Sequence, residues 1–185
     1  MQRLPTQLNG PLLLAPAVHG DDRGFFLESY RHEGLAEFGV TDHFVQDNHS
    51  RSRRGVLRGM HYQSGQAKLV RCARGAIYDV LVDIRRGSPQ FGQWEGFTLD
   101  DSEHRLLYVP NGFAHGFCVL SEIADVTYKV STYYDPSLES GFALDDPEVA
   151  IRWPDDVEAI VSERDRTAPL LSERTPDLPF EYAPA

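Results

Sequence analysis

Gly55-Val56-Leu57-Arg58-Gly59-Met60-His61-Tyr62-Gln63 begins the stretch of sequence that decides the fold, and Gln66-Ala67-Lys68 and Gly75 complete it. Two short runs typical of β-strands lie between glycines that mark turns. His61 and Gln63 are two residues apart, so on a strand they point to the same face. Lys68 begins the second run. The pattern predicts two neighbouring strands of a small barrel, with polar side chains facing its interior.

This spacing resembles the first motif of the metal-binding cupins, in which a glycine, His-x-His, a glutamate and a glycine follow one another along two barrel strands. Here Gln63 stands in place of the second histidine and Lys68 in place of the glutamate. The second cupin motif, Pro-x-Gly-x-x-His, is matched by residues 110–115, which end at His115. Two of the four metal ligands therefore remain, whereas a catalytic metal site usually keeps three protein ligands. We predict no metal, and the exchange of an anionic ligand for a cation indicates acid/base chemistry.

The rest of the chain consists mainly of short β-type runs separated by glycine and proline turns, a pattern that predicts an all-β fold. These runs lie at 44–48, 55–62, 69–72, 76–84, 95–99, 106–109, 113–120 and 126–134. Short helices are expected at 30–39 and 155–166, and the polar, proline-containing residues 173–185 are expected to form a loosely ordered tail. We predict one domain, residues 1–185, folded as a cupin-type antiparallel jelly-roll barrel with a few short helices at the termini.

Composition limits the possible partners. The 185 residues carry a net charge of -10, which argues against binding to a nucleic-acid polymer or an anionic membrane. A small phosphorylated ligand stays possible where arginines gather locally. The two cysteines, Cys72 and Cys118, lie in apolar strand-like surroundings and are interpreted as reduced core thiols. No apolar run is long enough for a signal peptide or a membrane span, so we expect a cytoplasmic protein.

The predicted barrel interior is unusually polar. Taken singly, a strand histidine such as His61 or a tyrosine such as Tyr128 is most simply a hydrogen-bonded structural residue. Together, two histidines, a lysine, a tyrosine and several arginines would cost free energy in an ordinary core, because buried polar groups need partners. Such a lining suits a polar ligand. The arginines at 51, 53 and 54 are most simply a solvated loop, whereas Arg23 and Arg58 adjoin glycines leading to the cavity and suit phosphate contacts.

Nearly the whole chain resembles the dTDP-4-dehydrorhamnose 3,5-epimerase family, which consists of metal-free cupins. The resemblance is carried by several dispersed motifs in the family's order, at residues 22–28, 44–48, 55–63, 66–70, 78–85, 87–89, 112–117, 133–134 and 162–165. It implies an isomerase that converts dTDP-4-dehydro-6-deoxy-D-glucose to dTDP-4-dehydro-L-rhamnose, without a cofactor. Members of the family are homodimers in which an N-terminal segment of one subunit helps complete the partner's site, so the resemblance also implies a homodimer.

The same resemblance implies roles for particular residues. His61 matches the general base, Asp165 the carboxylate paired with it, and Tyr128 the residue that handles the proton on the opposite face. Lys68 matches the residue beside the C4 carbonyl oxygen. The positions implied to bind the substrate are Lys68 itself together with Arg23, Glu28, Gln46, Asp47, Asn48, Arg58, His115, Tyr134, Glu139 and Arg164.

Some alternatives stay open. Relatives in antibiotic-sugar pathways invert only C3 or only C5, and small departures from the family pattern, such as Met60 in place of leucine, leave this choice undecided. A sugar-nucleotide ketoisomerase is a related possibility. A metal-dependent cupin oxygenase would need the missing ligands, and a binding module without catalysis would need no base and no opposed acid.

Overall fold

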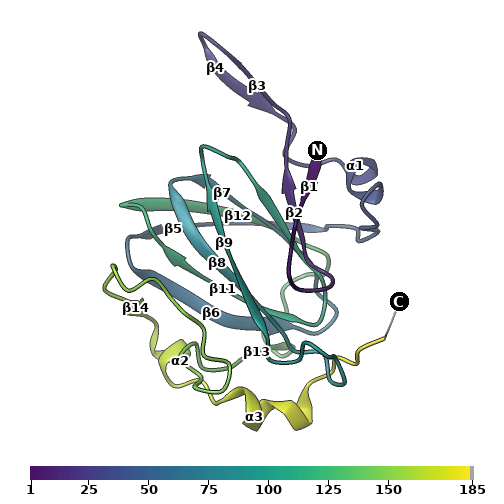
Figure 1. Ribbon diagram of the computed structural model, residues 1–185, viewed down its shortest axis with the longest axis vertical. Helices are drawn as coiled ribbons and strands as arrows, with labels where there is room; N and C mark the ends of the chain where they lie inside the picture. Colours follow the sequence, from purple (N-terminus) through teal and green to yellow (C-terminus); the bar gives the residue numbers. More distant parts are fainter. Residues whose placement is uncertain (184–185) are drawn as a thin grey trace.

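The computed structural model describes residues 1–183 and contains two curved antiparallel sheets that face each other, with a small separate hairpin (Figure 1). The strands of the first sheet, in spatial order, are β1 (Gln2–Leu4), β2 (Leu12–Ala15), β10 (Leu106–Val109), β7 (Lys68–Arg74), β12 (Ile123–Val130) and β5 (Gln46–Arg53). The second sheet contains β13 (Glu139–Gly141), β6 (Val56–Gln63), β11 (Phe113–Val119), β8 (Ala76–Asp83) and β9 (Trp94–Asp100). The predicted all-β barrel is thus confirmed.

The two glycines that bracket the key motif are required by the backbone. Gly55 and Gly75 have φ angles of 81° and 78°, a region that disfavours side chains. A Cβ atom at Gly55 would lie 2.1 Å from the carbonyl oxygen of Glu158, and one at Gly75 would lie 2.2 Å from that of Ile123. These glycines let the chain turn sharply at each end of the β6–β7 segment, so that Arg58, His61 and Lys68 come to the same interior.

The interior of the barrel is divided into an apolar end and a polar end. Alternate residues of β7, β8, β10, β11 and β12 form the main core, which includes Val70, Leu81, Leu107, Phe117 and Val126. Further along the same strands the inward positions become polar, at Lys68 on β7 and Tyr128 on β12. The apolar end therefore supports the strands, and the polar end is left for a ligand.

Helices and loops cover the outer faces of both sheets. The helix α1 (His32–Ala36) buries Leu35 against a cluster on the first sheet that includes Leu14 and Leu106. Its bounds are narrower than the predicted 30–39. On the second sheet, the chain after β13 packs Phe142 and Leu171 against Val82. This C-terminal cover includes β14 (Ile160–Val161), α2 (Glu163–Arg166), α3 (Leu171–Arg174) and the short 3-10 helix Thr175–Asp177.

Three local expectations are wrong. The helix expected at 155–166 is confined to its last four residues, because the preceding Ile160–Val161 pairs in parallel with β6. Two residues of the expected arginine loop, Arg51 and Arg53, lie on the extended strand β5, where they alternate with the buried Ser52. The strand expected at 126–134 ends at Val130.

The expected loose tail is also more closely packed than its composition indicates. Leu178 and Phe180 are buried in the cluster that covers the second sheet, with 1% and 3% of their surface exposed. Residues 184 and 185, the end of that expected tail, lie outside the described part of the chain. No helix within residues 1–183 is long and apolar enough to cross a membrane.

The hairpin formed by β3 (Val18–Asp21) and β4 (Gly24–Leu27) projects away from the barrel (Figure 1). Phe26 is 72% exposed at its surface, and the nearby Phe25 is 56% exposed. Phe25 still touches the barrel through the ring of His104, at 4.4 Å between ring centroids. A projecting two-stranded hairpin with exposed aromatic residues is marginally stable by itself.

Candidate active site

A hollow of about 260 Å³ occupies the polar end of the barrel. Both sheets contribute to it, since β5, β7 and β12 face β6, β11 and β13 across the interior. Its polar lining residues are Asn48, Ser50, Arg58, His61, Gln66, Lys68, His115, Tyr128, Tyr134 and Glu139. Eight of these ten residues were predicted from the sequence. Ser50 and Gln66 were missed, although the alternation of small polar residues along β5 was a usable signal for Ser50.

His61 is held by a carboxylate from the C-terminal cover. Its Nε2 lies 2.6 Å from Oδ1 of Asp165, and the imidazole is 27% exposed whereas Asp165 is buried. Ser162 caps the helix α2 by accepting a hydrogen bond from the Asp165 backbone N–H. Burial raises the pKa of Asp165, but hydrogen bonds and the nearby His61 outweigh it and keep the pKa below its usual value. The hydrogen bond to the ionised Asp165 fixes the orientation of the His61 ring.

Tyr128 approaches the hollow from the opposite sheet. It lies on the inner face of β12, whereas His61 lies on β6. Burial, reinforced by the negative charge of Glu139, raises the pKa of Tyr128, so the phenol is protonated at neutral pH. The hollow therefore has an imidazole on one sheet and a protonated hydroxyl on the other.

Lys68 carries a positive charge deep inside the barrel. It begins β7 and reaches solvent only in part. Burial lowers the pKa of Lys68 to about 8, against the opposing attraction of Glu139 and Asp79. An ammonium group in such a place is a strong electrostatic stabiliser of negative charge that forms on a ligand, because little water screens it.

A hydrogen-bonded group at the mouth of the hollow joins three predicted residues. The Tyr134 hydroxyl donates to Oε2 of Glu139 at 3.0 Å, and Nη1 of Arg164 donates to the same oxygen at 2.7 Å. Gln46 accepts a hydrogen bond from the Tyr134 backbone N–H, and Gln63 accepts one from Asp135. Gln63, which was expected to face the interior with His61, does not line the hollow; its buried amide instead holds the loop that carries Tyr134. A second hollow of about 400 Å³ adjoins this group and shares His61, Tyr134 and Glu139 with the first.

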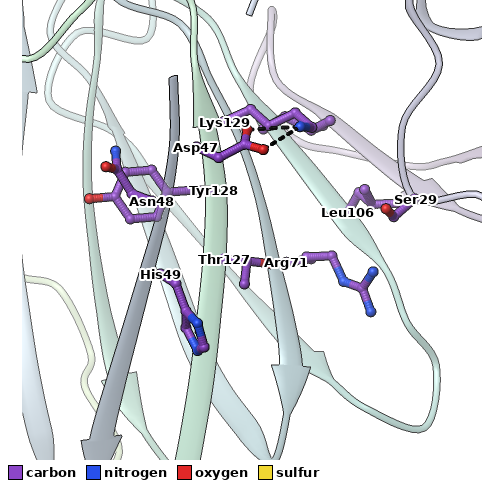
Figure 2. Close-up of a pocket in the computed structure, with 10 residues that line it drawn as sticks. Ser29, Asp47, Asn48, His49, Arg71, Leu106, Thr127, Tyr128 and Lys129 are labelled. Atoms are coloured by element: carbon purple, nitrogen blue, oxygen red, sulfur yellow. Dashed lines mark hydrogen bonds and ion pairs between the residues drawn. The ribbon is translucent and has the colours of Figure 1, made fainter. Parts of the chain in front are cut away.

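The structure does not bring every predicted residue to the hollow of the same chain. Arg23 pairs with Asp21 on the projecting hairpin, and Glu28 pairs with Arg31 nearby. Asp47 follows Gln46 on β5 and points to the outer face, where it pairs with Lys129 (Figure 2). In Figure 2, Asn48 and Tyr128 lie together on one side of the strands, and the Arg71 side chain points to the other. Strand alternation explains why neighbours in sequence separate in this way.

His115 has a partner that the motifs did not indicate. It lies opposite His61 in the β6–β11 register, and its Nε2 lies 2.9 Å from Oδ2 of Asp79. Asp79 is fully buried on β8. It lies in a run of apolar residues, and only the three-dimensional register brings it to His115. Within residues 1–183, no three His, Cys, Asp or Glu side chains are arranged to hold a metal ion.

Comparison with known proteins identifies this arrangement. The barrel and its polar hollow define the chain as a dTDP-sugar epimerase, an isomerase that acts on carbohydrates. Residues 5–173 match the family model for dTDP-4-dehydrorhamnose 3,5-epimerase, and the chain belongs to that family.

Individual relatives agree with this assignment. The dTDP-4-dehydrorhamnose 3,5-epimerase of Salmonella typhimurium is 48% identical over 174 residues, which cover 92% of this chain and 95% of that protein. The corresponding protein of Pseudomonas aeruginosa is 52% identical over 158 residues, covering 84% and 87%. A crystal structure of a dTDP-6-deoxy-D-glucose-3,5-epimerase from Legionella pneumophila, in complex with dTDP-4-keto-L-rhamnose, superposes with a TM-score of 0.95 at 45% identity and covers 99% of both chains.

The position of Lys68 predicts a pH dependence of stability. Its pKa in the folded protein, about 8, lies below its usual value of 10.5, so the unfolded chain binds more protons between these two values. The free energy of unfolding is therefore expected to gain a contribution as the pH rises from about 8 to 10.5. Urea unfolding of the wild type and of Lys68→Met across this range measures it, since the variant lacks the contribution. Lys129→Met, which removes an ammonium from the outer face, is the control. Equal pH slopes in wild type and Lys68→Met would contradict the prediction.

Proposed function

We propose that this chain is a cofactor-independent dTDP-4-dehydrorhamnose 3,5-epimerase that acts on dTDP-4-dehydro-6-deoxy-D-glucose. The observation that carries the proposal is the opposition of His61 and Tyr128 across one hollow, with Lys68 beside them. Inversion of a carbon next to a ketone needs these three functions. A base removes the α-hydrogen, a second group returns a proton to the other face, and a positive charge stabilises the oxygen between the two events.

The proposed reaction proceeds through an enolate. His61 takes the hydrogen from C3 or C5 as a proton, and the electron pair of the C–H bond moves toward the C4 carbonyl oxygen. Tyr128 then donates its proton to the opposite face of the same carbon, which restores the ketone and inverts the centre. Asp165 stabilises the imidazolium formed in the first step. Exchange with solvent returns both side chains to their starting states before the second carbon reacts.

Lys68 supplies what acid/base catalysis lacks. Positioned acids and bases contribute roughly 10²–10⁴-fold to the rate, which is too small to overcome the weak acidity of a ketone α-hydrogen. The ammonium of Lys68 stabilises the negative charge on the carbonyl oxygen, a role that a metal fills in other barrels of this type. Its protonated form is the active one, so activity falls as the pH rises past about 8.

Arg58, His115, Asn48 and Glu139 are proposed to bind the nucleotide-sugar in this hollow. Arg58 has only the hydroxyl of Ser52 as a hydrogen-bond partner within the described residues, at 3.3 and 3.4 Å. Its guanidinium is therefore free to bind a phosphate group. Tyr134 is exposed at the mouth, and an aromatic ring there suits stacking against a base.

A homodimer is proposed to complete the site. Arg23 and Glu28 belong to the projecting hairpin and lie outside the hollow of their own chain, and the hairpin exposes Phe26. An exposed aromatic hairpin beside predicted ligand residues is suited to reach into a partner's site. A cytoplasmic location is supported by Cys72 and Cys118, which are buried free thiols.

Proton exchange tests the function directly. The chelator-treated protein is incubated with dTDP-4-dehydro-6-deoxy-D-glucose in deuterated water, and the C3 and C5 hydrogens are followed by NMR. Deuterium is expected at both carbons, because each inversion replaces a carbon-bound hydrogen with one from solvent. Exchange at a single carbon would instead make the protein a mono-epimerase, an activity named for a relative that is 44% identical, the dTDP-4-dehydrorhamnose 3-epimerase of Streptomyces niveus. No exchange at either carbon would reject the proposal.

The two central side chains are tested by substitution. His61→Ala and Lys68→Ala are each expected to lower kcat by about 10²–10⁴-fold while leaving the fold intact, because each removes a group needed only for the reaction. Steady-state kinetics and circular dichroism provide the measurements. Lys129→Ala, which removes the other lysine of the chain, is expected to keep wild-type kcat. Near-normal turnover in a pure His61→Ala sample would exclude it as the base.

The shared site predicts complementation between two inactive subunits. Arg23→Ala and His61→Ala are each expected to be impaired. If the hairpin of one subunit completes the other's site, a mixed dimer contains one site with both native residues. Mixing and re-equilibrating the two variants is therefore expected to restore up to half of the wild-type activity per mixed dimer. Activity that stays at the average of the two separate variants would show that each site is built from one chain.

A further inference from the structure

The loop between β12 and β13, residues 131–138, forms part of the rim of the hollow. It carries Tyr134, whose hydroxyl donates a hydrogen bond to Glu139 at the start of β13. The adjacent Tyr133 is 71% exposed, so its burial contributes little to holding the loop. Within the described residues, no backbone–backbone hydrogen bond involves residues 132–134. The sheets therefore do not fix this part of the loop by their own ladders.

The side chain of Gln63 supplies bonds that the backbone lacks. From the end of β6, its Nε2 donates to the carbonyl oxygen of Tyr133 at 3.0 Å and to Oγ1 of Thr132 at 3.2 Å. Its Oε1 accepts a hydrogen bond from the Asp135 N–H at 3.0 Å. The Gln63 backbone pairs with Glu139, so the end of β6 holds the loop from both sides. With 4% of its surface exposed, Gln63 uses its whole amide for this purpose.

Two further glutamines hold the same loop. Gln66, in the turn after β6, donates from Nε2 to the carbonyl oxygen of Thr132 at 3.2 Å. Gln46, at the start of β5, accepts a hydrogen bond from the Tyr134 N–H at 3.0 Å. Gln46, Gln63 and Gln66 together form a glutamine clamp. Gln63 lines neither of the two hollows, so it acts on a ligand only through the loop that it holds.

We propose that Gln63 is a positioning residue for nucleotide binding: through the glutamine clamp it fixes the loop 131–138, so that Tyr134 stands ready at the mouth to stack on the base. A neutral amide suits this place, because it donates to a carbonyl oxygen and accepts from an N–H at the same time. A loop that is ordered before the ligand arrives lowers the entropic cost of binding. The inference rests on the proposed function in one respect, the role given there to Tyr134.

Gln90 provides a matched control. Its Nε2 donates to the carbonyl oxygen of Gln7 at 3.0 Å, and its Oε1 accepts a hydrogen bond from the Asn9 N–H at 2.8 Å. Gln90 therefore holds a loop with both ends of its amide, as Gln63 does, but it lines neither hollow. Gln63→Met and Gln90→Met each remove one such amide and keep an unbranched, flexible side chain.

The first test is the affinity for dTDP, measured by isothermal titration calorimetry, together with KM and kcat for the sugar nucleotide. Gln63→Met is expected to raise the Kd of dTDP and KM about tenfold, because the ligand must then order the loop, and to change kcat less than about threefold. Gln90→Met is expected to keep all three wild-type values. In the Tyr134→Ala background, Gln63→Met is expected to have no further effect on Kd, since the clamp acts through Tyr134.

Amide hydrogen exchange, followed by NMR, tests the clamp independently of activity. In Gln63→Met the Asp135 N–H is expected to exchange about tenfold faster than in the wild type, because its acceptor has been removed. Gln90→Met is expected to speed exchange at Asn9 and to leave Asp135 unchanged. Unchanged exchange at Asp135 in Gln63→Met overturns the proposal.

The binding measurements decide the proposal in the same way. An unchanged Kd of dTDP in Gln63→Met overturns it, and so does an equal further loss of affinity in the Tyr134→Ala background. If Gln63→Met does not fold, Gln63→Glu provides the second variant, which keeps an acceptor for Asp135 but loses the donor to Tyr133. A raised Kd is expected there, and an unchanged Kd overturns the proposal. If the wild type binds dTDP but exchanges neither carbon-bound hydrogen, the proposed function fails, and the Kd of Gln63→Met still decides the role of the clamp.

Discussion

The positive charge of Lys68 inside the barrel is the constraint on which the site depends. An ammonium group taken out of water is costly unless nearby negative charge compensates it. The negative charge of Glu139, on the edge strand β13, opposes the effect of burial on the pKa of Lys68, and both side chains line the same hollow. Within the described residues Glu139 bonds to Tyr134 and Arg164 and not to Lys68, so the ammonium keeps its hydrogen atoms available for a ligand. A direct ion pair would stabilise the charge better but would occupy the group that the reaction needs.

The barrel tolerates the buried charge of Lys68 because its interior is divided into an apolar end, which stabilises the fold, and a polar end. Alternate residues of five strands build an apolar core around Val70 and Leu81, and the same strands present polar groups further along. The cover on the outer faces adds two further apolar clusters, one under α1 and one under the C-terminal segment. The C-terminal cover has a second role, since it delivers Asp165 to His61. The packing of the C-terminal segment and the geometry of the candidate site are therefore linked through the short helix α2.

Much of the fold was predictable because its signals are local. The glycines at 55 and 75 mark turns that only glycine fits, strand alternation predicted an inner face for His61, and Lys68 and Tyr128 were expected at the site from the cupin motif and the family resemblance. The remainder depends on contacts between distant segments. The helical composition of 155–159 is overridden because the chain there leads into the strand Ile160–Val161 beside β6. The tail after residue 173 is polar on average, yet Leu178 and Phe180 are enough to anchor it.

What the sequence did not predict at the site also depends on contacts between distant segments. His61 and His115 each have a carboxylate partner far away in the sequence, at Asp165 and Asp79, and only the three-dimensional fold brings each pair together. Arg23 and Glu28 differ from these residues. Their sequence motif predicts that they bind the substrate, but within one chain they lie at or beside the projecting hairpin, away from the hollow.

The same geometry bears on how many carbons are inverted. His61 and Tyr128 are fixed on opposite sheets, and one base and one acid serve both C3 and C5 only if the sugar presents each carbon in turn between them. In the proposed reaction Lys68 stays near the C4 oxygen throughout, and C4 lies between the two reacting carbons. Rotation of the sugar about an axis through C4 satisfies both conditions. If the reaction runs as proposed, the walls of the hollow that permit this rotation, which include Tyr134 and Glu139 at the mouth, decide between one and two inversions.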